Sequence, residues 1–154
     1  MSGTTPLQWS VYPFAALGTQ LFHDILRLRI DVFVVEQQCT YPELDGLDPN
    51  ALHIIGQLSD GAVAAYARIL PPGVDGMPHV GRVVVELQQR RKRMGNQLME
   101  QVHKALCSKY GSARSALAAQ AHLQGFYGQH GYVAVSAEYA LDGIPHVDMV
   151  RNED

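Results

Sequence analysis

Hydrophobic positions along the chain change period several times, and each change marks a predicted element. From residue 7 to residue 13 apolar and polar side chains alternate, which predicts a short strand. From Leu21 to Phe33 apolar side chains recur every three or four residues, which predicts a helix of about four turns. The segment that follows contains two prolines and several carboxylates without a clear period, so we expect a long acidic loop up to residue 52.

The middle of the chain predicts three consecutive strands. The runs "HIIGQL", "GAVAAYARIL" and "HVGRVVVE" are apolar or alternating, and segments rich in glycine, proline and aspartate separate them. Short connections between neighbouring strands favour antiparallel pairing, so these runs are expected to form a meander.

The last third predicts a helix from Gly95 to Gly111, a buried strand "SALAAQA" and a short helix "HLQGFYGQHG" that ends at glycine. The segments "YVAVSAEYAL" and "HVDMV" flank the turn dipeptide Asp142-Gly143, which predicts a hairpin. The element order therefore predicts an α/β protein of the α+β kind. Its sheet is mixed and mostly antiparallel, is flanked by helices, and contains one parallel strand–helix–strand crossover.

Composition adds bounds to this picture. The 154 residues are expected to form a single domain, residues 1–154, and the net charge of −3 with 47% hydrophobic residues is typical of a soluble globular protein. No apolar run reaches the roughly 18 residues of a membrane span, and the first residues lack a signal-peptide pattern, so we expect a cytoplasmic protein without membrane contact. Cys39 and Cys107 lack metal-ligand spacing, and no metal site is predicted.

Charge becomes informative at the tract Arg90, Arg91, Lys92 and Arg93, which lies between the third strand of the meander and the long helix. Backbone N–H groups at a helix start have no partners within the helix, and together with four cations they would suit a phosphate. The tract could instead be a solvated basic turn. A nucleic-acid patch is a third reading, weakened by the overall negative charge and by the lack of aromatic residues among the cations.

The stretch from Val85 to Gly95, "VELQQRRKRMG", resembles the pyrophosphate-binding loop of the GNAT N-acetyltransferases. Arg90 stands for the leading arginine of that motif and Gly95 for its last glycine, whereas Arg91 and Arg93 replace glycines that are usual in the family. Further segments, "LRIDVFVVEQQCTYPELDGLD", "AYARIL", "GRVVV", "QAHLQGFYGQHGY" and "DGIPHVDM", are similar to the ElaA-type branch and follow the same order over nearly the whole chain.

This resemblance implies acetyl transfer from acetyl-CoA to a primary amine in a ternary complex. The pantetheine arm would lie between two splayed strands, paired with the backbone of Val83 and Val85, and an N–H near Val84 or Val85 would stabilise the oxyanion. The implied cofactor contacts are Val83, Val84, Val85, Arg90, Arg91, Lys92, Arg93, Met94, Gly95, Asn96, Gln97, Gln120, Leu123, Phe126 and Tyr127.

Three residues are the catalytic candidates. Tyr127 falls where the family commonly has a tyrosine near the thioester sulfur, so it could protonate the thiolate, although it could equally be a core aromatic residue. Glu36 could bind the acceptor ammonium or take its proton, or it could form a structural ion pair with Arg68 or Arg82. His146 could be a base or a half-buried structural histidine.

Several alternatives stay open. Glu86 and His122 are further candidates for the base, and the acidic loop with Glu43, Asp45 and Asp48 would suit a cationic acceptor. A non-catalytic acyl-CoA-binding or regulatory module with the same fold is the principal rival to an enzyme. The acceptor could be a polyamine-like metabolite, an amino sugar, a peptide N-terminus or a lysine. Edge strands of the C-terminal hairpin could mediate a homodimer.

Overall fold

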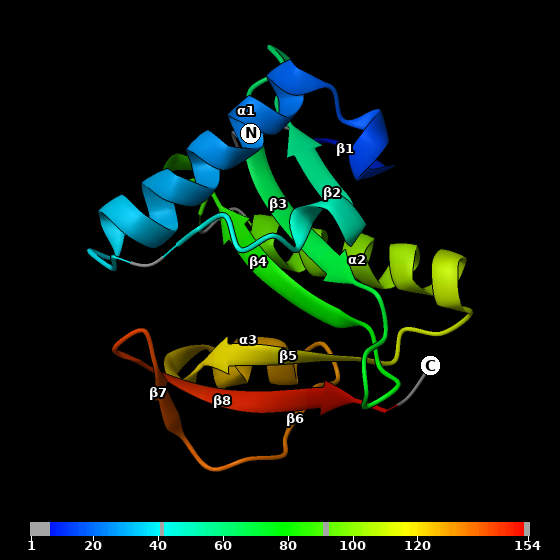
Figure 1. Cartoon of the computed structure of the whole chain (residues 1–154), viewed down its shortest axis with the longest axis vertical. Helices are drawn as coiled ribbons and strands as arrows, with labels where there is room; N and C mark the ends of the chain where they lie inside the picture. Colours follow the sequence, from blue (N-terminus) through cyan, green and yellow to red (C-terminus); the bar gives the residue numbers. More distant parts are fainter. Residues whose placement is uncertain (1–6, 41, 91–92, 153–154) are drawn as a thin grey trace.

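The structure, a computed structural model, describes residues 7–40, 42–90 and 93–152 (Figure 1). Its strands are β1 (Gln8–Pro13), β2 (Leu52–Gln57), β3 (Val63–Leu70), β4 (His79–Val85), β5 (Ser115–Gln120), β6 (Val133–Ala134), β7 (Tyr139–Leu141) and β8 (Ile144–Arg151). They form one sheet in the order β1-β2-β3-β4-β5-β8-β6, and β7 pairs with β8. The predicted mixed, mostly antiparallel sheet is confirmed.

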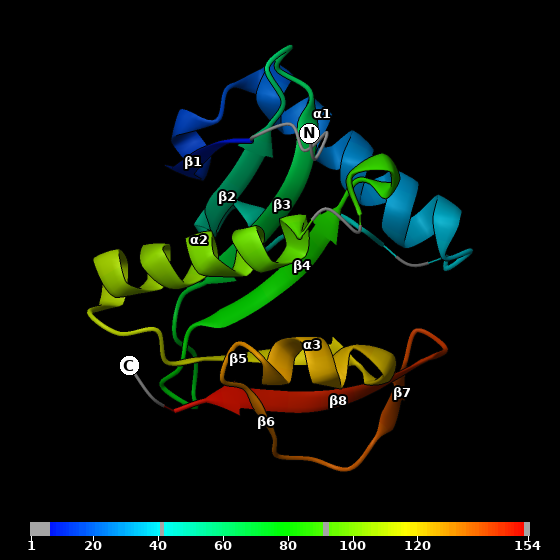
Figure 2. The same cartoon turned by 180° about the vertical axis from the view of Figure 1, so that it is seen from behind.

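Helices cover both faces of this sheet. They are α1 (Thr19–Ile30), continued by the π-helical turn η2 (Asp31–Glu36), α2 (Met94–Tyr110) and α3 (Gln124–Gly128). Short 3-10 turns are η1 (Phe14–Ala16), η3 (Asp48–Asn50), η4 (Leu87–Gln89) and η5 (Ala121–Leu123). Figures 1 and 2 show α1 on one face and α2 with α3 on the other. None of the helices within the described ranges is long and apolar enough to cross a membrane.

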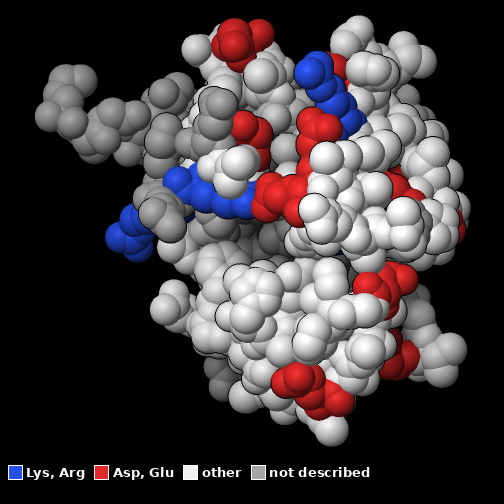
Figure 3. Space-filling view, turned by 90° about the vertical axis from the view of Figure 1, so that its left-hand side faces the viewer, with Lys and Arg blue, Asp and Glu red and all other residues white. Residues whose placement is uncertain are grey.

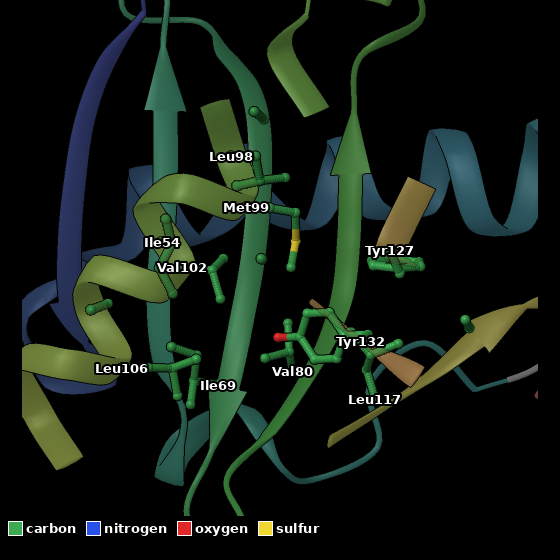
Figure 4. Packing of buried hydrophobic residues seen from close by; sticks show 14 of the residues in the cluster. Ile54, Ile69, Val80, Leu98, Met99, Val102, Leu106, Leu117, Tyr127 and Tyr132 are labelled. Carbon is green, nitrogen blue, oxygen red and sulfur yellow. The ribbon is translucent and has the colours of Figure 1, made fainter. Parts of the chain in front are cut away.

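Two clusters of apolar side chains hold the helices to the sheet. On the α2 face, Leu98, Met99, Val102 and Leu106 are fully buried against Ile54 and its neighbours (Figure 4). On the α1 face a second cluster contains Ile25, Leu28, Val32, Ile55, Tyr66 and Val84. Because adjacent residues of a strand point to opposite faces, β2 and β3 need apolar residues at consecutive positions. This explains their unbroken hydrophobic runs.

Strands β4 and β5 form the parallel crossover that the sequence predicts, with α2 as the connection. Their ladder is short, because His79 opposite Ala116 is the one pairing of the two strands within the described residues. Beyond it the strands diverge toward their carboxyl ends, as Figures 1 and 2 show. The sheet therefore splits into two halves between β4 and β5.

The C-terminal hairpin differs from the sequence prediction in one respect. The turn at Asp142 and Gly143 is confirmed, with φ of 52° and 78°. The segment "YVAVSAEYAL", however, is not one strand but the two short strands β6 and β7. Between them the Ser136 hydroxyl accepts the Asp148 N–H at 2.9 Å, and the Asp148 carbonyl accepts the N–H of Val135 at 2.8 Å. A side chain thus takes a backbone position in the ladder and interrupts the strand.

Six charged residues tie the acidic loop to the sheet and to α1. Arg29 donates to Glu43 at 2.6 Å and to Asp48 at 2.8 Å. Arg68 donates to Asp45 at 3.0 Å and to Asp48 at 3.1 Å. We call this the buried ion network; its members are Arg29, Glu43, Asp45, Asp48, Arg68 and Arg82.

This network corrects two expectations. The loop carboxylates Glu43, Asp45 and Asp48 do not form an open anionic surface for an acceptor, because arginines of the protein already pair with them. Arg68 and Arg82 are also not the partners of Glu36, since both belong to the buried ion network. Three cations and three anions in one cluster cancel in formal charge.

Candidate active site

Two cavities meet where β4 and β5 diverge. The larger cavity, of about 630 Å³, lies along the start of α2, and the smaller cavity, of about 210 Å³, lies toward β8 and the hairpin turn. Figure 3 looks onto this side of the molecule, where a hollow crosses the surface and basic and acidic side chains adjoin above it. Six residues line both cavities: Phe33, Gln37, Val83, Gln120, Leu123 and Tyr127.

The first turn of α2 presents backbone N–H groups to the larger cavity. Met94, Gly95 and Asn96 line it, and the side chain of the N-cap residue Arg93 makes no capping hydrogen bond. Arg93 at the N-cap adopts a left-handed conformation, with φ of 61° and ψ of 20°. In the loop motif that this stretch resembles, glycine is usual at this position, and here an arginine adopts the positive φ at a strain of roughly 1–2 kcal/mol.

Gly95 is where this turn approaches α3. A Cβ atom there would lie 3.3 Å from the ring of Phe126, which also lines the larger cavity. This contact is tighter than ordinary van der Waals packing. A glycine therefore keeps the helix start close to α3, whereas a larger residue would push Phe126 into the cavity.

Arg90 lies at the rim of the larger cavity and is already paired. Its guanidinium donates two hydrogen bonds to the Glu36 carboxylate, at 2.7 and 3.0 Å, and Nε donates to the carbonyl of Val85 at 3.0 Å. Both acidic and basic partners are about one-third exposed. Glu36 thus pairs with Arg90 and not with Arg68 or Arg82, and the Val85 carbonyl already accepts one hydrogen bond from the protein.

The backbone N–H of Val85 points away from β3, toward the side of β4 where β4 and β5 diverge. Glu86 donates to Ala64 at 2.8 Å, and hydrogen-bonded pairs alternate along an antiparallel ladder. Val84, opposite Tyr66, is therefore bonded to β3, whereas Val85 directs its N–H away from β3. This narrows the expected oxyanion donor from Val84 or Val85 to Val85. Earlier in β4 a β-bulge interrupts the pairing with β3 at Arg82, whose φ is 52°.

Tyr127 lies at the junction of the two cavities. It comes from α3, is 7% exposed, and packs edge-on against Phe126 and Tyr132. Burial raises the pKa of Tyr127 well above its ordinary value, and Tyr132 adds to this shift. The hydroxyl therefore stays protonated at neutral pH and can donate a proton.

His146 lies on β8 in the smaller cavity, opposite Gln120 in the ladder. Its Nδ1 is 2.8 Å from the carbonyl of Ile144, which can only accept a hydrogen bond. Nδ1 therefore carries the proton in the neutral ring, and Nε2 keeps its lone pair. Tyr139 stacks on the ring and fixes its plane. The histidine is thus prepared to accept a proton at Nε2.

Most predicted site residues come together here. The larger cavity is lined by the predicted residues Glu36, Val83, Val84, Val85, Arg90, Arg93, Met94, Gly95, Asn96, Gln120, Leu123, Phe126 and Tyr127. Gln97 does not line either cavity, because it lies further along α2 with its N–H bonded to Arg93. Arg91 and Lys92 lie outside the described residues.

The two further candidates for the base lie at different cavities. His122 lines the larger cavity, whereas Glu86 lines a different cavity of about 570 Å³ between α1 and the β2–β3 turn, so it is not a base for this site. Among the residues with described positions, no three His, Cys, Asp or Glu side chains are grouped as metal ligands.

Sequence reasoning missed the contributions of η2 and the hairpin. Phe33 and Gln37 line both cavities, and Cys39, Arg82 and Asp142 line the smaller one. The π-helical turn brings Phe33 and Gln37 to the site, and Gln37 accepts a bond from Gln120 at 3.4 Å. The apolar period of α1 continues smoothly into Phe33, so no local signal marks these positions.

Comparison with known proteins agrees with this geometry. Residues 27–152 match the family model described as an acetyltransferase (GNAT) domain. The chain belongs to the GNAT acetyltransferase family. Protein ElaA of Escherichia coli K12 is 39% identical over 148 residues, which cover 94% of this chain and 96% of that protein.

Two solved structures are also close. The crystal structure of an acyl-CoA N-acyltransferase from Pseudomonas aeruginosa has a TM-score of 0.89 at 40% identity and covers 94% of this chain and 99% of its own. The structure of Escherichia coli ElaA has a TM-score of 0.87 at 36% identity, with 95% and 99% covered. The fold is therefore the GNAT acyl-CoA N-acyltransferase fold, whose family uses an acyl-CoA and an acceptor.

Proposed function

We propose that this GNAT protein transfers the acetyl group of acetyl-CoA to a primary amine by direct attack in a ternary complex. The observation that supports it is the meeting of the two cavities at Val83, Gln120 and Tyr127. A cofactor in the larger cavity and an amine in the smaller one would place their reacting groups together at this junction. Holding two reactants in this way supplies much of the rate enhancement of an acyl transfer.

The larger cavity suits the cofactor in charge. The open N–H groups of Met94, Gly95 and Asn96, with the cation of Arg93, would bind the diphosphate. Arg90 would join them when its pair with Glu36 opens. The pantetheine arm would lie between β4 and β5, where β4 offers the N–H of Val85.

The reaction needs one base and one acid. The ammonium of the acceptor loses a proton to Nε2 of His146, and the neutral amine attacks the thioester carbonyl carbon. The N–H of Val85 stabilises the oxyanion, the C–S bond breaks, and the Tyr127 hydroxyl protonates the departing thiolate. The attacking nitrogen loses its second ammonium proton as the tetrahedral intermediate collapses, and this proton restores Tyr127 through solvent. His146 releases the first proton to solvent, so the protein ends unchanged and one proton is released per acetyl transfer.

A non-catalytic acyl-CoA-binding module is the second candidate. The pairing of Arg90 with Glu36 favours it, because the cofactor site of the free protein is partly closed by the protein itself. The prepared Nε2 of His146 favours the enzyme. Release of free CoA thiol decides between the enzyme and the binding module, since a binding module would bind acetyl-CoA without consuming it.

Calorimetry and a thiol assay test the proposal. Acetyl-CoA is expected to bind saturably at one site, and an amine panel is expected to release free CoA thiol. Tyr127→Phe should lower kcat by about 10²–10⁴-fold while acetyl-CoA affinity is kept. Tyr110→Phe, a partly buried tyrosine away from both cavities, is the matched control and should leave kcat unchanged.

His146→Gln should also lower kcat, because the group that takes the proton from the acceptor ammonium is lost. His79→Gln, at an exposed histidine paired with Asp75, is its control. Saturable binding with no thiol released for any amine would overturn the enzyme and leave the binding module. Full turnover by Tyr127→Phe across pH would overturn the assignment of the acid.

A further inference from the structure

The residues that line the smaller cavity indicate which kind of acceptor it would bind. This inference about the acceptor rests on the proposed function. The formal charges that line the cavity are those of Arg82 and Asp142, besides the titratable ring of His146. Arg82 donates to Glu43 at 2.8 Å and to Asp45 at 3.3 Å. Because the buried ion network balances three arginines against three carboxylates, Arg82 adds little net charge. Asp142 is therefore the charge that an acceptor meets.

Asp142 is held in place at the outer end of the cavity. It occupies the first position of the β7–β8 turn, where its φ is 52°, and its carbonyl accepts a hydrogen bond from the thiol of Cys39 at 3.2 Å. The turn is thus tied to the segment after η2. In the part of the chain that the structure describes, no ion pair occupies the Asp142 carboxylate.

The register of the sheet gives the order of groups along the cavity. Gln120 lies at the junction with the larger cavity and is opposite His146, while Ile144 lies two residues before His146 and next to the turn. Two strand residues span about 7 Å. His146 therefore lies at the end of the smaller cavity that is nearest the junction, and Asp142 lies further out in the turn, two residues beyond Ile144.

The apolar residues that line the smaller cavity are Phe33, Val80, Leu117, Leu123, Leu141 and Ile144, and of these Leu141 and Ile144 flank the turn. The cavity has a volume of about 210 Å³. These apolar walls suit a short alkyl chain, whose methylene groups would pack against them.

We propose that the acceptor is a short aliphatic diamine. One amine lies beside His146 at the junction and is acetylated, the methylene chain packs on the apolar walls, and the second ammonium pairs with Asp142. A carboxylate in place of the second ammonium would meet Asp142 with like charge. Free amino acids are therefore expected to be poor acceptors.

Wild-type protein and the Asp142→Asn variant test this proposal with four probes: putrescine, cadaverine, butylamine and the side-chain amine of a lysine amide blocked at its α-amine. Binding to the protein saturated with CoA is measured by calorimetry, and acetyl transfer by thiol release. The diamines should bind several-fold more tightly than butylamine. Asp142→Asn should raise KM for the diamines about five-fold, which corresponds to the upper range of exposed ion pairs, and leave KM for butylamine unchanged. Asparagine also tolerates positive φ, so the turn is kept.

Glu138→Gln is the matched control, because it removes one exposed carboxylate from the same hairpin without lining the cavity. It should change none of the four KM values. Equal KM for butylamine and putrescine, an equal effect of Asp142→Asn on both, or preference for the blocked lysine would overturn the diamine. Diamine binding that depends on Asp142 without thiol release would support this inference and overturn the proposed transfer. Failure of the diamine inference and failure of the proposed acetyl transfer would therefore give different results.

Discussion

Two sets of ion pairs in this protein contain similar residues but differ in burial. In the buried ion network, the side chains of Arg29, Glu43 and Asp48 are 0%, 5% and 4% exposed. In the rim pair, Arg90 and Glu36 are 33% and 38% exposed. When the rim pair opens, the charges of Arg90 and Glu36 return to water. If an ion pair of the network opened, its charges would stay in the interior of the protein. The first set is therefore suited to structure and the second to a site that must open.

Hydrogen bonds to neutral groups reinforce the network. Nε2 of His53 donates to the carbonyl of Asp48 at 3.0 Å, and Nδ1 accepts from the hydroxyl of Tyr66. Burial lowers the pKa of His53 below its ordinary value, which keeps the ring neutral for this arrangement. The loop before β2 thus gains a fixed shape from polar contacts, where a few apolar residues alone would leave its backbone underdetermined.

The largest expected effect is at Asp48. Asp48→Asn removes one charge shared by Arg29 and Arg68 and leaves the three arginines of the network with two carboxylates. We expect a loss of about 3–5 kcal/mol in the free energy of unfolding, measured by urea denaturation. Asp75→Asn, at an exposed carboxylate, should change it by less than about 0.5 kcal/mol. Equal stability of the two variants would show that the network is not structural.

The same network predicts the response to acid. Burial alone would raise the pKa of Asp45, but Arg68 and the N–H of Leu47 lower it to about 2. Burial likewise acts against ionisation of Asp48, and Arg29 with Arg68 lowers its pKa. A depressed pKa in the folded state stabilises the protein fully above the ordinary pKa near 4, and this stabilisation is lost as pH falls toward 2. Stability measured between pH 5 and pH 2 should therefore fall more steeply for the wild type than for Asp48→Asn.

The next effect concerns Arg90 and cofactor binding. Arg90→Gln should weaken acetyl-CoA by about ten-fold or more, since a hydrogen bond between charged groups contributes about 1.5–3 kcal/mol. Binding of a pantetheine analogue without the diphosphate should change little. Calorimetry measures both. An equal loss for the two ligands would mean that Arg90 acts through the carbonyl of Val85 and the shape of β4, and not through the diphosphate.

The smallest effect is expected for Glu36. Glu36→Gln removes the carboxylate that occupies Arg90 in the free protein, so acetyl-CoA should bind about two- to five-fold more tightly, in keeping with an exposed pair of up to about 1 kcal/mol. The free energy of unfolding should stay within about 0.5 kcal/mol. Glu100→Gln, exposed on α2, is the control. Weaker acetyl-CoA binding in Glu36→Gln would show that the pair holds Arg90 in its binding position and does not compete with the cofactor.

Local patterns predicted the elements well and the pairing of charges poorly. The meander, α2 and the buried strand β5 follow from period and turn composition, because a sheet covered on both faces demands continuous apolar strands. The partners of Glu36, Arg68 and Arg82 could not be predicted in this way. Side chains between 20 and 54 residues apart in the sequence form these pairs. The break between β6 and β7 likewise depends on Ser136, whose bond to Asp148 is a tertiary contact.

The sequence by itself determined the order of the elements and the cationic start of α2, because hydrophobic period, turn residues and a helix terminus act over a few neighbouring positions. Only the tertiary structure decided that β4 and β5 diverge, that the loop carboxylates are neutralised inside the protein, and that Asp142 remains as the charge of the smaller cavity. These outcomes depend on distances between segments remote in the chain, and such distances are set when two apolar faces of one sheet are packed at once.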